Sequence, residues 1–60
     1  MSVSKENLRI VVKSALTALA EKYQVEPVEI VNGMNAGNEN LTSGFAKLVK
    51  IGMNLYSEKL

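Results

Sequence analysis

The sequence of 60 residues contains no cysteine, histidine, aspartate or tryptophan. Without cysteine no disulfide can form, and without cysteine, histidine and aspartate a zinc site is effectively excluded. The lack of histidine and cysteine also removes the commonest general base and the thiol nucleophile of enzymes. We therefore expect a protein that is not an enzyme and that holds no cofactor and no metal.

An excess of one charge and long apolar runs are also missing. Seven basic residues stand against six acidic ones, and the resulting net charge of +1 does not favour strong attraction to nucleic acid. The longest strongly apolar run is Ile10–Val12, which is too short for a transmembrane helix or a signal peptide. We expect a cytoplasmic protein with no membrane partner.

What the sequence does contain is a helical pattern over residues 5–24, uninterrupted by glycine or proline. Apolar residues recur there at steps of three or four, as they do along one face of an amphipathic helix. The predicted buried face consists of Leu8, Val12, Ala15, Leu19 and Tyr23, and it is widened by Val11, Leu16 and Ala18. Ala20 is interpreted as a contribution to helix propensity. This helix is the longest apolar surface of the chain, and the remaining residues or a second copy must cover it.

The start of this helix carries its own signals. Ser4 is a favoured N-cap residue, and Val3 and Leu8 then stand at the two positions of a hydrophobic staple. Glu6 falls in the first turn, where the helix dipole favours a negative charge. These residues predict that the helix begins at residue 5.

A short second helix is predicted over residues 27–35. Pro27 suits the first helical position, and Glu26 before it is expected to lie outside the helix. Glu29 falls in the first turn, so capping and the helix dipole explain the two neighbouring carboxylates better than acid–base chemistry does. Asn32-Gly33 is also a favoured β-hairpin turn, which leaves a hairpin open as the alternative for residues 25–36.

A loop and a third helix complete the chain. Residues 35–40 are rich in asparagine and glycine, and Asn38 or Asn40 is expected to cap a helix over residues 41–58. Its predicted buried face is Leu41, Phe45, Leu48 or Val49, Gly52, and Leu55 or Tyr56. Gly44 and Gly52 either weaken this helix or allow a neighbouring backbone to approach closely.

The predicted fold is therefore all-α, a single small helical domain of residues 1–60 with long, short and long helices. A core of fewer than about 70–80 residues supplies little stability without a disulfide, a metal or a partner chain, and the first two are excluded. Because 47% of the residues are hydrophobic, we expect a homodimer or higher helical bundle. The expected interface residues are Leu8, Val12, Ala15, Leu19, Tyr23, Phe45, Leu48, Leu55 and Tyr56.

The expected function is binding without catalysis. A chain of this size and composition suits a regulator, inhibitor or adaptor that binds another protein, as many accessory proteins of phages and mobile elements do. An oligomer that sequesters an anionic small molecule through Arg9 or a lysine is a further hypothesis.

The main alternative is DNA binding, in two forms. Residues 16–35 resemble the helix-turn-helix pattern, with Ala20 at the small position, but Gln24 stands where glycine is usual. One lysine against four glutamates gives residues 16–40 a net charge of −3, the wrong sign for phosphate contacts. In the second form, the polar face of the predicted third helix contacts the DNA in the major groove. The residues that could contact nucleic acid or another anion are Lys5, Arg9, Lys13, Ser43, Lys47, Lys50 and Asn54.

Overall fold

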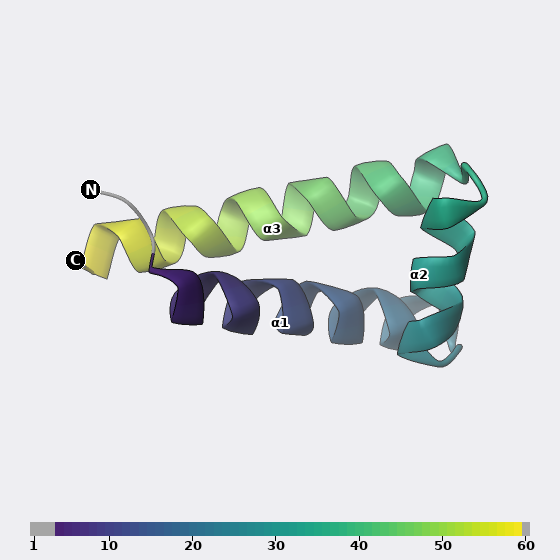
Figure 1. Ribbon diagram of the computed structural model, residues 1–60, viewed down its shortest axis with the longest axis horizontal. Coiled ribbons are helices and arrows are strands. Elements are labelled where there is room, and N and C mark those ends of the chain that lie inside the picture. Colours follow the sequence, from purple (N-terminus) through teal and green to yellow (C-terminus); the bar gives the residue numbers. More distant parts are fainter. Residues whose placement is uncertain (1–3, 60) are drawn as a thin grey trace.

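A computed structural model describes residues 4–59 and shows three helices. They are α1 (Lys5–Tyr23), α2 (Pro27–Asn35) and α3 (Glu39–Lys59), and the described residues contain no strand. The long helices α1 and α3 run antiparallel, and the short α2 crosses the end where they are joined (Figure 1). The predicted all-α fold is confirmed, and the hairpin alternative for residues 25–36 is wrong, because residues 27–35 are helical.

Helix α1 begins and ends with capping hydrogen bonds. The Asn7 backbone N–H donates to Ser4 Oγ over 3.1 Å, so Ser4 is the N-cap. At the other end Gln24 is left-handed with φ of 57°, and the Val25 N–H donates to the Ala20 carbonyl over 3.0 Å. This is the hydrogen-bond pattern of a Schellman motif, which usually has glycine at the left-handed position. Val3, the predicted staple residue, lies outside the described part.

Helices α2 and α3 are joined by a tight turn. Gly37 takes a φ of 89°, and the Asn38 N–H donates to the Gly33 carbonyl over 3.0 Å. The Asn38 side-chain oxygen then accepts from the N–H groups of Asn40 and Leu41, over 3.0 and 3.2 Å. Asn38 is therefore the cap of α3, and α3 begins two residues earlier than expected.

The core lies where all three helices meet. Its buried residues include Leu19 and Ala20 from α1, Ile30 from α2 and Leu41 from α3. Ala20 was expected to contribute only helix propensity, but it is 4% exposed. Ala20 is not part of the predicted buried face of α1. It belongs instead to the cluster that includes Ile30 of α2, and this packing explains why it is buried.

Helices α1 and α3 also pack closely through small residues. A Cβ atom added to Gly52 would lie 2.7 Å from Val11 Cγ1, a contact that real Cβ atoms essentially never make. At Gly44 the nearest atom, Leu19 Cδ2, is at an ordinary 3.4 Å. Gly52 therefore allows α1 to approach closely, whereas a Cβ atom at Gly44 would make only an ordinary van der Waals contact with α1.

Candidate interaction surfaces

The predicted interface residues occupy different environments. Ala15 and Leu19 are 3% and 4% exposed, so within the single chain they are core residues. Leu8, Tyr23 and Leu55 are 39%, 45% and 56% exposed. The remaining predicted contacts, Val12, Phe45, Leu48 and Tyr56, are partly buried. The surface therefore retains apolar side chains on both long helices.

One of these surfaces is a groove between the two long helices, which we call the interhelical groove. It is lined by Val11, Ser14, Ala15, Ala18, Leu48, Ile51, Gly52, Leu55 and Tyr56. Ile51 and Leu55 border it with 52% and 56% of their surface exposed. Sequence reasoning missed Ile51, although its distance of four residues from Leu55 places both side chains on one face of α3. Exposed branched side chains beside a groove are suited to contact with another protein.

A second surface, which we call the basic ladder, lies on α1. It is a shallow hollow lined by Lys5, Leu8, Arg9, Val12, Lys13 and Leu16. Its three cations and its three aliphatic residues each recur at steps of four, so they form two adjacent rows along the helix. All three cations are exposed, as sequence reasoning expected. The ladder thus combines positive charge with accessible apolar surface.

The polar face of α3 also lies where the sequence placed it. Ser43, Lys47, Lys50 and Asn54 are all exposed. Lys47 and Lys22 also line a hollow that continues the interhelical groove through Ala18, Leu48 and Ile51. The groove therefore has cations at the end nearer α2.

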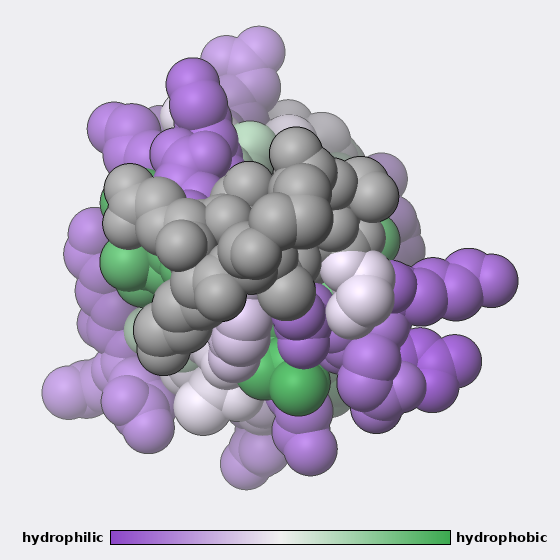
Figure 2. All heavy atoms as spheres, turned by 90° about the vertical axis from the view of Figure 1, so that its left-hand side faces the viewer, coloured by the Kyte–Doolittle hydropathy of each residue, from purple (hydrophilic) through white to green (hydrophobic). Residues whose placement is uncertain are grey.

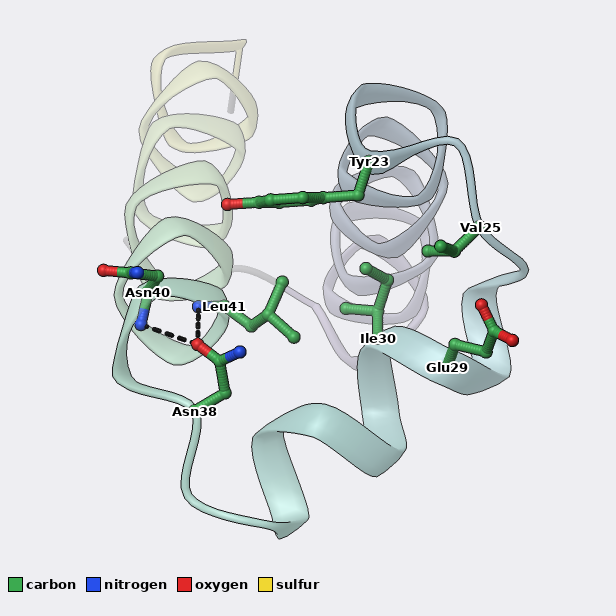
Figure 3. A pocket seen from close by; sticks show the side chains of 7 residues that line it. All are labelled: Tyr23, Val25, Glu29, Ile30, Asn38, Asn40 and Leu41. Carbon is green, nitrogen blue, oxygen red and sulfur yellow. Dashed lines mark hydrogen bonds between the residues drawn. The ribbon is translucent and has the colours of Figure 1, made fainter.

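The opposite charge gathers around α2. Figure 3 shows an open pocket of about 230 Å³ at the α2 end, where Tyr23 reaches from α1 toward α3 above Ile30 and Leu41. Its polar residues are Glu29, Asn38 and Asn40. The Asn38 oxygen is already used as the α3 cap, and Glu29 lies in the first turn of α2. Helix capping and the helix dipole therefore account for Asn38 and Glu29 without a ligand.

Several large hydrophobic side chains are exposed on the two long helices, among them Leu8 and Ile10 on α1 and Ile51 and Leu55 on α3. Figure 2 views the end opposite α2, where hydrophobic atoms reach the surface between long hydrophilic side chains.

Two further observations bear on the class of site. Within the described residues no three metal-ligating side chains lie together, and no helix there is long and apolar enough to cross a membrane. Comparison with protein-family models, with curated proteins and with solved structures finds no match to this chain.

Proposed function

We propose that the protein is a small, non-catalytic cytoplasmic interaction protein, which self-associates and acts by binding another protein as a regulator, inhibitor or adaptor. The observation that supports the proposal is the exposure of large hydrophobic side chains on both long helices, among them Ile10 on α1 and Ile51 and Leu55 on α3. The interhelical groove is the surface that we assign to the partner protein. The buried residues Val11 and Ala15 form its floor, and Ile51 and Leu55 form an exposed apolar border.

A partner protein in this groove would bury apolar surface that the single chain leaves exposed. Apolar surface removed from water stabilises a complex by about 25 cal/mol per Å², before the costs of association. Val11 and Ala15 are each 3% exposed, so the floor belongs to the folded core and is formed before binding. A groove formed in advance lowers the ordering cost of binding.

The test is recovery of partners from the native host with tagged protein, in the presence and absence of nuclease. We expect a protein partner that survives nuclease treatment and is lost with Ile51→Glu. The matched control is Ile10→Glu, because Ile10 is 43% exposed on α1 and lines neither the groove nor the ladder. Loss of the partner in both variants, or recovery only through nucleic acid, would contradict the proposal.

DNA binding through α3 is a second candidate, supported by the exposure of Ser43, Lys47, Lys50 and Asn54 along one face. A helix-turn-helix reading through α2 has less support, because its exposed residues include Glu29 and Asn32 and its sequence contains no cation. Nanomolar duplex binding at physiological salt, abolished by Lys47→Ala with Lys50→Ala, would favour this function over protein binding.

A further inference from the structure

The surface around the start of α2 carries both apolar and acidic side chains. Val28 is 61% exposed, the most exposed of the large hydrophobic side chains, and Val25 is 38% exposed. Glu26 and Glu29 flank Val28 in sequence and are exposed as well. We call these four residues the acidic end. Nothing in a single chain covers Val28, although it stands in the most negatively charged part of the sequence.

The basic ladder has the complementary composition. Lys5, Arg9 and Lys13 supply the positive charge that the acidic end lacks, and Leu8, Val12 and Leu16 supply an apolar row beside it. The dimensions also correspond. The nine residues from Lys5 to Lys13 and the nine residues of α2 each span about 12 Å of helix, because eight steps of about 1.5 Å separate the first residue from the last.

We propose that two copies pair with the acidic end of each on the basic ladder of the other. This inference rests on the self-association in the proposed function and specifies its surfaces. Val28 packs against the aliphatic row of the partner copy, while Glu26 and Glu29 lie among the cations of the ladder. Each copy carries both surfaces, so the two contacts form together around a two-fold axis and the pair is closed.

In the proposed pair the two copies run antiparallel. The ladder begins at the start of α1, and the acidic end lies at the opposite end of the molecule, where α2 crosses the long helices (Figure 1). Reversing the direction of the second copy therefore brings unlike surfaces together at both ends.

The interhelical groove is the less favourable surface for pairing through the same acidic end. The lining of the groove includes the exposed small residues Ser14 and Ala18, and its charged neighbours toward α2 are the two cations Lys22 and Lys47. The ladder offers three cations interleaved with three accessible aliphatic residues along one helix. Pairing through the ladder also leaves the groove free for a partner protein.

The experiment is a charge exchange followed by sedimentation at several protein concentrations. Arg9→Glu alone and Glu29→Lys alone each place like charges together, and we expect each to raise the dissociation constant of the pair at least about tenfold. The double variant carries the exchanged pair and is expected to return to within about threefold of the wild type. Lys50→Glu and Glu21→Lys are the matched controls, because both are exposed and lie outside the two surfaces. Circular dichroism checks that every variant is folded.

The outcomes separate this inference from the proposed function. Weakening by the single variants with recovery in the double variant supports the pairing. A dimer that ignores both single variants but dissociates with Ile51→Glu overturns the pairing and leaves self-association intact. Weakening without recovery in the double variant also overturns it. A monomer of the wild type at all concentrations overturns both the pairing and the self-association.

Discussion

At the scale of single residues, Gln24 holds a backbone conformation that glycine adopts without steric strain. Its φ of 57° makes it the one non-glycine residue of positive φ in residues 4–59. A left-handed conformation costs about 1 kcal/mol or more for a residue with a Cβ atom, although glycine gives back part of this through the entropy of the unfolded chain. We expect Gln24→Gly to raise the free energy of unfolding by about 0.5 kcal/mol.

Urea unfolding measures this change through the midpoint at constant slope. Gln24→Ala is the control, because alanine keeps the Cβ atom and is expected to bring no gain. A lower midpoint for Gln24→Gly would show that the glutamine side chain stabilises the turn by more than its backbone strain costs.

The two interior glycines of α3 provide the second prediction. Both lie in one helix, so alanine should bring each a similar gain in helix propensity, up to about 1 kcal/mol. Gly44→Ala meets only Leu19 Cδ2 at 3.4 Å and is expected to be stabilising. Gly52→Ala meets three Val11 atoms at 2.7–3.4 Å, and Val11 is buried and stiff at χ1. We expect a net loss of about 1–3 kcal/mol for Gly52→Ala, as for other overpacked sites.

Thermal melts of the two variants at equal protein concentration decide the matter. Opposite signs are the expected result. Equal stabilisation of both would mean that α1 moves away from α3 at little cost. The sequence left two interpretations of these glycines open, because spacing alone does not reveal which glycine lies close against a side chain of another helix.

At the scale of the helices, Ile30 is the residue of α2 that is buried most deeply, and Met34 packs against the same core. Ile30 is 1% exposed and is the only residue of α2 that is fully buried in the described structure. It contacts a core built from both long helices, so it fixes α2 across their ends. Replacing a buried isoleucine with alanine typically costs about 2–5 kcal/mol, which approaches the whole stability of a chain this small.

We therefore expect Ile30→Ala to unfold the chain or to lower its melting temperature strongly, as measured by circular dichroism at 222 nm. Val28→Ala is the control for replacing an aliphatic side chain of α2 with alanine, because Val28 is 61% exposed. At concentrations where the chain is monomeric, the Val28 change should be nearly neutral. Similar losses in both variants there would refute the role of Ile30 as the anchor.

Helix boundaries were largely predictable because the signals are local. The expected range 5–24 became Lys5–Tyr23, and the expected range 27–35 was found unchanged. The third helix was expected at 41–58 and spans Glu39–Lys59, because Asn38 and not Asn40 provides the cap. Asn38 and Asn40 are two residues apart and have the same capping propensity, so the sequence alone could not show which of them is the cap. The turn at Gly37 is what distinguishes their positions.

The core and the surfaces were less predictable, since they depend on how helices cross. The burial of Ala20 requires α2 to pack over α1, and periodicity within α1 gives no sign of this. On α3, Tyr56 is partly buried whereas Leu55 is 56% exposed, a choice that the sequence left open. The ladder cations were recognised as a row, but the two carboxylates of the acidic end were interpreted only through capping, the helix dipole and net charge, and not as part of a surface with Val28.

At the scale of the whole molecule, stability is expected to depend on protein concentration. An assembly that forms only from folded chains adds its binding free energy to folding, so dilution lowers the melting temperature. We expect a measurable decrease between about 100 and 1 μM for the wild type. A folded monomer at low micromolar concentration, with a melting temperature that ignores dilution, would contradict self-association.

Leu19→Glu tests the core on which that assembly depends. Leu19 is 4% exposed and packs with residues from all three helices, so a glutamate there would bury an unpaired charge. We expect loss of most helical signal at every concentration. Lys22→Glu, on the exposed surface one turn later, controls for the change of charge. Retained helicity in Leu19→Glu would show that the described core is not what holds the helices together.

The start of α1 and the end of α3 lie side by side, away from the turn at Gly37 (Figure 1). One connection between these two helix ends would therefore close the described fold into a ring. A linker across that gap, with new ends opened at Gly37, would give a circular permutant that retains every helix. A Cβ atom at Gly37 would meet nothing within 4 Å, so this position has room for new chain ends. The same closeness of ends suits the fold to insertion into a surface loop of a carrier protein, where it would add a helical module without forcing the loop apart.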